Sequence, residues 1–461
     1  MRLRFLNREK EQLRLKKLFT SRESTLCCLY GRRRVGKSRL IQETLPAEKA
    51  VYFVSDEREP ALQRKALSSV IASVLPGFEE VQYPDWPSLF ERWWREAPSG
   101  SILILDEFPY LVKASPEIPS LLQNSVDRFR ERGIHMVLCG SSQRMMQGLV
   151  LDAASPLYGR AQEIIHVMPL GIFWTAKALN LKGAIDVLEA YSVWGGIPRY
   201  WELAADHVTT WESIENLVLD PMGVLHHEPR RLLLDDIRET AQAGSILALI
   251  GSGCNRLSEI AARLSKPSTS LTRPMQRLLE LGLIRRDVPF GASEKSSKKT
   301  LYSINDPFLS FWFRYVEPNR SRLEAGPIRP IVEKVRQDFR HHVGRTWEGL
   351  SRLALPRLQL EGIEWKPAQR WWGAGKNKKP LEFDIISESA DSRSLFVGEA
   401  KLSIGRNELM ACHNSLRRRL DLLPFVSSYS RIETAVFVAE TRIRKNANQV
   451  VTGREVLTVL K

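Results

Sequence analysis

The chain has 461 residues, 43% of them hydrophobic, and is therefore long enough to fill about three separate cores. Its five cysteines match neither a zinc-ligand spacing nor a disulfide framework, and no uncharged apolar run reaches the roughly 18 residues that cross a membrane, so we expect a cytoplasmic protein with no membrane partner. The net charge of +15 favours an anionic partner, for which nucleic acid is the commonest candidate, although a merely basic surface would give the same total.

A phosphate-binding loop is the first motif along the chain. Helical spacing over residues 5–19 precedes an apolar run at 26–30, which predicts a buried strand, and Gly-x-x-x-x-Gly-Lys-Ser follows at 31–38 before a helical segment at 39–44. Glycines let backbone N–H groups close round a triphosphate, and the helix N-terminus adds positive charge. The nucleotide-binding residues predicted from this motif are Gly31, Arg32, Arg33, Arg34, Val35, Gly36, Lys37, Ser38 and Arg39.

Four side chains are predicted to carry out ATP hydrolysis. Lys37 would reach the β and γ phosphates, and the Ser38 hydroxyl would ligate magnesium. A strand at 50–54 and a second run of aliphatic residues at 102–105 predict further parallel strands, and the second run delivers Asp106 and Glu107 at its carboxyl end. Asp106 would hold Mg²⁺ through water, and Glu107 would orient or activate the attacking water. The alternatives are a glycine-rich surface turn and an acidic helix cap.

The next two predicted strands, at 135–139 and 163–167, are each associated with a candidate residue whose role stays open. Ser141 or Ser142 would sense the γ phosphate, or either would be an ordinary helix cap. Arg160 would neutralise transition-state charge, either in its own subunit or across an interface, or it would form a surface salt bridge.

The order of these motifs resembles the archaeal-type ATPase family, a DEXX-box member of the STAND and AAA-like P-loop NTPases. The resemblance covers roughly residues 1–230 and rests on the segments 5–9, 31–38, 105–111, 156–160 and 195–200. It implies an α/β fold with a P-loop ATPase core at 1–170 and a helical lid at 171–235. In such proteins Gly-Gly-x-Pro lies in the lid beside the nucleotide base, which is the role it implies for Pro198. Asn7 stands where the family usually has glycine.

Residues 236–316 have the pattern of a winged helix. Short amphipathic helices are predicted at 256–264 and 268–281, and Gly282 separates them from two strands around a Gly/Ser/Lys-rich tip. Arg273 and Arg277 would enter a major groove, unless Pro274 kinks the second helix. The residues expected on phosphates are Lys295, Lys298 and Lys299. An architectural spacer or a dimerisation surface is the alternative.

The last predicted domain, 331–461, contains a second set of clustered charges. Residues 381–386 alternate acidic and apolar side chains, and 395–401 form the returning strand, so a hairpin would bring Asp384 together with Glu399 and Lys401. Carboxylates bind a hard divalent cation that activates water, and a lysine can hold the scissile phosphate. Glu348 could add a further carboxylate from a helix.

These residues resemble the PD-(D/E)xK nuclease superfamily, with a restriction-endonuclease-like α/β fold, and in particular the nuclease-like C-terminal domain fused to the ATPase family above. The resemblance implies that Asp384 and Glu399 bind a second divalent metal and that Asp384, Glu399 and Lys401 are catalytic. The alternative is a retained fold whose acids form ordinary salt bridges. Arg417, Arg418 and Arg419 would follow a phosphate backbone or form a solvated helix face.

Together these features predict a modular ATPase in which ATP and Mg²⁺ control DNA binding, and metal-dependent DNA cleavage, by the C-terminal part. One alternative is a slowly hydrolysing ATP switch that recognises DNA or a protein without cleaving it. Another is a transcription regulator that acts through the winged helix. The sequence leaves the oligomeric state open.

Overall fold

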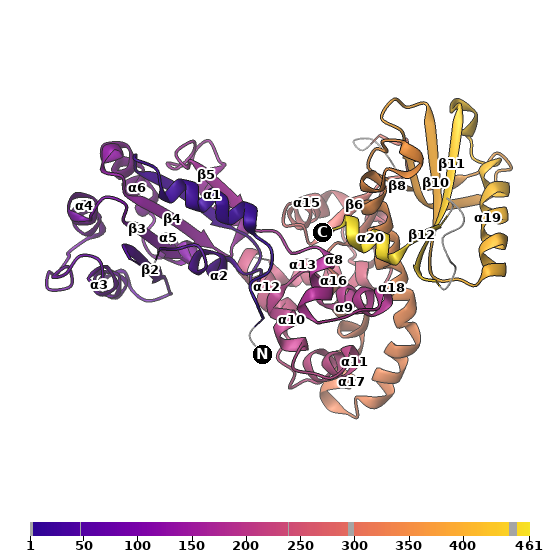
Figure 1. Ribbon diagram of the computed structural model, residues 1–461. Helices are drawn as coiled ribbons and strands as arrows, with labels where there is room; N and C mark the ends of the chain where they lie inside the picture. Colours follow the sequence, from indigo (N-terminus) through magenta and orange to yellow (C-terminus); the bar gives the residue numbers. More distant parts are fainter. Residues whose placement is uncertain (1–2, 47, 238, 294–298, 442–449) are drawn as a thin grey trace.

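Figure 1 shows the computed structural model, which describes residues 3–46, 48–237, 239–293, 299–441 and 450–461. A parallel sheet with its helices lies at one end of the molecule, a mixed sheet lies at the other, and helical segments connect them (Figure 1). Among the described residues, no helix combines the length and the apolar character that a membrane span requires. Lys295 and Lys298, predicted to contact phosphates, lie outside the described residues.

The first sheet has five parallel strands in the order β2-β3-β4-β1-β5. The strands are β1 (Thr25–Tyr30), β2 (Ala50–Val54), β3 (Ile102–Asp106), β4 (His135–Gly140) and β5 (Glu163–His166). Every residue of β1, β3 and β4 is buried, as expected for central strands that are covered on both faces. Cys27 and Cys28 point into cores on opposite faces, so they are packing residues, as predicted.

Helices cover both faces of this sheet. Helices α1 (Glu9–Phe19) and α2 (Lys37–Gln42) pack with Cys27 and Leu29 on one face. The opposite face carries α3 (Pro60–Ile71), α4 (Trp86–Glu96), α5 (Phe108–Ala114), α6 (Ile118–Arg128) and α7 (Gln143–Val150). Tryptophans of α4 fill much of that second core: Trp86, Trp93 and Trp94 are almost fully buried.

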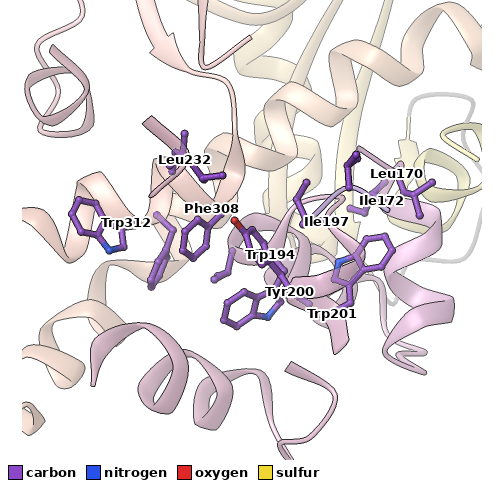
Figure 2. Close-up of a cluster of buried hydrophobic side chains, with 14 of the residues drawn as sticks. Leu170, Ile172, Trp194, Ile197, Tyr200, Trp201, Leu232, Phe308 and Trp312 are labelled. Atoms are coloured by element: carbon purple, nitrogen blue, oxygen red, sulfur yellow. The ribbon is translucent and has the colours of Figure 1, made fainter. Parts of the chain in front are cut away.

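A helical segment follows the sheet and has an aromatic core. It comprises α8 (Ile172–Ala178), α9 (Ala184–Trp194), α10 (Pro198–Ala204), α11 (Thr210–Ile214), a π-helical turn (Glu215–Leu219) and α12 (Glu228–Asp236). Figure 2 shows Trp194, Tyr200 and Trp201 of this segment near Phe308 of α16 (Pro307–Tyr315). Gly196, between α9 and α10, is required because a Cβ there would overlap the carbonyl group of Leu170, which precedes the segment.

The middle of the chain has the element order expected of a winged helix. Helices α13 (Thr240–Gly251), α14 (Leu257–Arg263) and α15 (Thr272–Glu280) precede the antiparallel pair β6 (Ile284–Asp287) and β7 (Leu301–Ile304). Pro274 is the third residue of α15 and therefore lies in its first turn, where proline is tolerated. Short 3-10 turns lie at Arg130–Arg132, Ser268–Leu271, Glu317–Asn319, Leu360–Gly362 and Val426–Ser428.

A 30-residue helix, α18 (Arg329–Leu358), follows α17 (Arg320–Ala325) and joins the helical segment to the second sheet. His342 contacts the Ser192 carbonyl oxygen at 2.9 Å on one side, and Trp347 donates to the Phe437 carbonyl at 3.1 Å on the other. Because both side chains are buried, α18 belongs to the cores of both regions.

The second sheet is mixed and has the order β12-β11-β10-β9-β8. Strands β8 (Gln369–Ala374), β9 (Pro380–Glu388) and β10 (Ser394–Ser403) are antiparallel, whereas β11 (Arg431–Glu440) and β12 (Val450–Thr452) run parallel to β10. Helix α18 packs on one side together with α20 (Gly453–Val459), and α19 (Arg406–Leu420) covers the other through Leu409 and Leu416. The predicted hairpin between residues 381 and 401 is therefore present as β9 and β10.

Candidate functional site

The loop at residues 31–38 connects the end of β1 to the start of α2. Lys37 is buried, and its Nζ donates hydrogen bonds to the carbonyl oxygens of Gly31 at 2.9 Å and Arg32 at 3.2 Å. The lysine side chain thus folds back across the loop. Gly36 has φ 98°, a conformation that side chains with a Cβ rarely adopt, so glycine is required where the loop enters the helix.

Two residues predicted to hold magnesium meet at the end of the sheet. The Ser38 hydroxyl donates to Asp106 Oδ2 at 2.8 Å, and the Tyr52 hydroxyl makes a short hydrogen bond to the same oxygen. Burial, followed by the nearby Asp106 carboxylate, raises the pKa of Tyr52, so the phenol stays protonated and remains a donor. A hydroxyl and a carboxylate at this distance suit a hard divalent cation, and both fit Mg²⁺ as the P-loop pattern requires.

Glu107 is held by the strand next to its own. Its backbone is left-handed, with φ 51°, and its carboxylate accepts hydrogen bonds from Ser141 Oγ at 2.5 Å and from the Ser141 amide at 3.3 Å. The Glu107 side chain accepts no capping hydrogen bond from the backbone of α5. The alternative prediction, that Glu107 is an acidic helix cap, is therefore wrong. Ser142, by contrast, caps α7 and donates to Asp236 at 3.1 Å.

Arg160 does not lie beside the phosphate loop of its own chain. This corrects the prediction that it could neutralise transition-state charge in its own subunit. Gln162 pairs with Leu26 near the start of β1, whereas the loop follows the other end of that strand. Arg160 therefore lies toward the amino-terminal ends of the strands, away from the loop, and its Nε donates to Asp127 at 3.0 Å. The observed contact is the surface salt bridge, and action across an interface stays a prediction.

The three arginines of the loop are each paired with an acid outside the parallel sheet. Arg32 forms a short ion pair with Asp306, the N-cap residue of α16, and Arg34 lies 3.0 Å from Glu228. Arg33 lies 3.6 Å from Asp235 on α12. Arg39, just beyond the loop, lies 3.6 Å from Glu202. None of these partners follows from the motif, because each comes from a distant part of the chain.

Tyr200 connects the loop with the helical segment. It accepts a hydrogen bond from Arg32 at 3.2 Å and donates one to Glu228 at 3.2 Å. Burial raises the pKa of Tyr200 and also that of Glu228, which is 1% exposed. Pro198 begins the helix that carries Tyr200, and its predicted contact with a nucleotide base stays a prediction.

A turn ahead of α1 closes one side of the loop. Arg8 is buried and donates to the Met168 carbonyl at 2.6 Å and the Val35 carbonyl at 3.4 Å. Asn7, found where the resembling family has glycine, has φ 58°. That left-handed conformation explains why glycine suits the position and why asparagine, which tolerates it, can replace it.

The second predicted site is assembled on β9 and β10. Asp384 Oδ2 accepts a hydrogen bond from the Ala400 amide at 3.0 Å, and Lys401 Nζ lies 3.3 Å from Glu399. Burial, followed by the charges of Glu399 and Glu348, raises the pKa of Asp384 to about 7. Buried carboxylates that repel one another in this way are stabilised when a divalent cation binds them.

Arg419 of α19 already occupies part of this acid cluster. It forms a short ion pair with the buried Glu399 and donates to the Glu382 carbonyl at 3.0 Å. A cavity of about 590 Å³ borders Glu399, Lys401 and Arg419. The donor set fits a second metal ion, provided that Arg419 releases Glu399. Sequence reasoning missed this contact, although it identified Arg419 as part of a basic cluster.

The parallel sheet, the loop between β1 and α2, and the acids at the end of β3 define a P-loop NTPase. Residues 5–203 match the family model described as an ATPase domain predominantly from Archaea, and residues 312–411 match a family described as archaeal and bacterial proteins of unknown function. Residues 5–203 are thus similar to an ATPase domain, and together with the P-loop fold this match supports ATPase activity. A domain of this kind implies a bound nucleotide and usually Mg²⁺.

Two similar proteins were found, one by sequence and one by structure. The uncharacterized protein MJECL04 of Methanocaldococcus jannaschii is 27% identical over 424 residues, which cover 91% of this chain and 92% of that protein. The solved Walker-type ATPase of Pyrococcus abyssi is 21% identical, with a TM-score of 0.51 over 67% of this chain and 96% of that one. The second comparison supports the fold.

Proposed function

We propose that this ATPase uses the nucleotide state of its phosphate loop to control DNA binding by the rest of the chain. The observation that carries the proposal is the pairing of the three loop arginines with acids of other helices. Arg33 and Arg34 pair with acids of α12, and Arg32 pairs with the N-cap residue of α16. The loop that binds the triphosphate is thereby joined electrostatically to both the helical lid and the winged-helix region.

ATP and Mg²⁺ supply the transferable phosphoryl group and the charge that neutralises it. Lys37 would exchange the carbonyls of Gly31 and Arg32 for phosphate oxygens, and Ser38 and Asp106 would hold the cation. Glu107 orients water, while Ser141 fixes the position of its carboxylate. The present hydrogen-bond partners of Lys37, Ser38 and Glu107 all lie in the same loop or at the same end of the parallel sheet.

Competition for the loop arginines links the nucleotide to the lid. Arg32 and Asp306 are both mostly buried, so their ion pair is only weakly screened by solvent. A triphosphate brings several negative charges to the same arginines and weakens their attraction to Asp306 and Glu228. The acids of α12 and α16 then lose part of what holds them to the loop, and these helices shift.

A cavity at this junction provides room for such a shift. It has a volume of about 700 Å³ and is bordered by Arg32, Met168, Gly196, Asp306 and Arg345. These residues belong to the phosphate loop, the end of the parallel sheet, the lid, the N-cap of α16 and α18. A change in the Arg32–Asp306 contact therefore alters a space shared by the ATPase domain and the C-terminal part.

DNA is the proposed partner because the chain carries a net charge of +15 and an exposed basic residue on α15. Arg273 is exposed, whereas Arg277 is 23% exposed and pairs with Glu280 at 3.3 Å. Arg273 is accordingly the better candidate of the two for a groove contact. Lys299 lies between the described strands β6 and β7 and would add a phosphate contact.

The test is the affinity for labelled DNA at one fixed salt concentration, with ATP bound to the Glu107→Gln protein, with ADP, and without nucleotide. We expect affinities that differ by at least about fivefold between the ATP and nucleotide-free states, the lower end of ordinary allosteric coupling. The Lys37→Ala protein is the control and should show no nucleotide response. Equal DNA affinities in all states of a protein that binds ATP would contradict the proposal.

Metal-dependent DNA cleavage is a second candidate function, favoured by the convergence of Asp384, Glu399 and Lys401. The rival, DNA recognition without cleavage, is favoured by the Arg419–Glu399 pair, which neutralises an acid that a metal would need. Release of labelled fragments with Mg²⁺ or Mn²⁺, with and without ATP, distinguishes them. Cleavage that disappears in Asp384→Ala supports the nuclease, and binding without cleavage supports the rival.

A further inference from the structure

A third group of metal-ligating side chains lies away from both sites described above. His226 and His227 stand between the π-helical turn Glu215–Leu219 and α12, and Glu324 reaches them from α17. One ligand atom from each of the three residues lies within 4.8 Å of the other two. Imidazole nitrogens and a carboxylate oxygen are ligands that Zn²⁺ takes in proteins, where its coordination is usually tetrahedral.

The buried histidine has one nitrogen committed and one available. His226 is fully buried, and its Nδ1 lies 2.8 Å from the Val218 carbonyl oxygen, which fixes the proton on Nδ1. The other nitrogen, Nε2, has no hydrogen-bond partner in the described part of the chain. A buried acceptor left in this state costs about 1–3 kcal/mol. Histidines that bind metals usually donate their second N–H to a carbonyl or carboxylate, as His226 does.

The backbone around this histidine is fixed from two sides. The His226 amide donates to the Gly223 carbonyl at 3.0 Å, and the Trp312 indole donates to the His226 carbonyl at 2.7 Å. The rings of His226 and His227 are perpendicular, with centroids 4.7 Å apart. The first ligand is therefore held rigidly, while the exposed side chains of His227 and Glu324 leave access for an ion and for water.

We propose that His226, His227 and Glu324 bind one Zn²⁺ ion, with water completing its coordination. The carboxylate of Glu324, now 3.4 Å from Arg320, would exchange that exposed contact for the ion. Such an ion ties α17 to the turn that leads into Glu228, the acid that pairs with Arg34 of the phosphate loop. The site stabilises this end of the lid whether or not the protein binds DNA.

The experiment uses the untagged full-length protein, stripped of metal and then titrated with Co²⁺ as a spectroscopic substitute for Zn²⁺. Excess Mg²⁺ is present throughout to occupy the phosphate-loop and carboxylate sites. We expect one equivalent of Co²⁺ with the visible bands of four-coordinate geometry, displaced by Zn²⁺. His227→Ala and Glu324→Gln each lower the Co²⁺ affinity by at least about tenfold, since loss of even an indirect partner costs that much.

Two controls keep the proposal falsifiable. The exposed His341, on α18, serves as the matched variant His341→Ala, which should bind Co²⁺ like the wild type. Both ligand variants change exposed side chains, so they avoid the folding defect that replacement of the buried His226 would risk. Absence of stoichiometric Co²⁺ binding to the wild type would overturn the proposal, as would wild-type Co²⁺ affinity in His227→Ala and Glu324→Gln. Loss of Co²⁺ binding in Asp384→Ala would also overturn it, because the ion would then lie in the acid cluster.

Discussion

The phosphate loop and the C-terminal acid cluster both contain charges that are already neutralised, but the signs and the partners differ. In the loop, cations are paired with acids from other regions, namely Asp306, Glu228 and Asp235. In the acid cluster, Glu399 is paired with Lys401 and Arg419 of the same C-terminal region. A ligand that competes at the first site acts on distant helices, whereas a ligand at the second displaces only a local side chain. The first arrangement suits transmission of the nucleotide state to other helices, which we call signalling. The second suits control of access to the metal site by one side chain, which we call gating.

Loss of the loop lysine should have the largest effect, because it tests whether the first site performs chemistry at all. Lys37→Ala removes the ammonium that would stabilise developing charge on phosphate, so ATP turnover should fall by at least about a hundredfold in a phosphate-release assay. Lys113→Ala is the matched control, since Lys113 is exposed and contacts only Glu57 in the ion pairs described. Equal turnover in wild type and Lys37→Ala would remove the catalytic assignment.

The acid cluster should make the free energy of unfolding depend on pH. Because the pKa of Asp384 is raised to about 7 from an ordinary 3.8, the folded state binds more protons than the unfolded state between these values. The free energy of unfolding therefore falls as the pH rises through that window. Asp384→Asn removes this penalty and should stabilise the protein by on the order of 2 kcal/mol at pH 8 and by almost nothing near pH 4.

Chemical denaturation in the presence of a chelator measures this difference. Asp127→Asn, which removes a surface carboxylate at 55% exposure, is the control and should show no such pH trend. A destabilised Asp384→Asn protein at pH 8 would show that the carboxylate stabilises the fold as an ordinary ion-pair member.

A smaller effect is expected when the acid that pairs with Arg32 of the phosphate loop loses its charge. Asp306→Asn keeps the cap that Asp306 gives the Leu309 amide at 2.8 Å but removes the charge that holds Arg32. ATP then meets less competition, and its affinity should rise by about tenfold in a nucleotide titration. Unchanged ATP affinity would mean that Arg32 does not exchange partners.

The gating side is tested by the arginine of α19. Arg419→Ala frees Glu399 and should raise the affinity for Mn²⁺ at the acid cluster by on the order of fivefold, because the ion no longer displaces a cation. Isothermal titration with Asp384→Ala as the blank isolates this site. A decrease in affinity would show that Arg419 orients the carboxylate for the metal.

The smallest effect is expected at Arg160. Since the side chain is partly exposed and pairs with an exposed aspartate, Arg160→Ala should change the free energy of unfolding by no more than about 0.5 kcal/mol. Turnover at high dilution, which disfavours contacts between copies of the chain, should also stay unchanged. A large loss of turnover under those conditions would mean that the side chain reaches its own phosphate loop.

Local sequence patterns predicted the parts of the molecule whose residues are close together in the chain. The loop at 31–38 and the acids at the end of β3 each lie within one strand and its flanking turn, and Asp384 and Glu399 lie on two consecutive strands of one hairpin. The partners could not be predicted in this way, because Tyr200, Glu228 and Asp306 are far from the loop in sequence and reach it only through tertiary packing. Likewise, the position of Arg160 depends on the register of β5 against β1.

The most direct test of the account is amide hydrogen exchange in α12 and at the start of α16, measured in the Glu107→Gln protein with and without ATP. If the triphosphate draws the loop arginines away from Glu228, Asp235 and Asp306, exchange in these two helices should become faster when ATP binds, while the exchange of α4 stays constant. Protection that is unchanged or increased in α12 and α16 at saturating ATP would contradict the claim that the loop arginines transmit the nucleotide state.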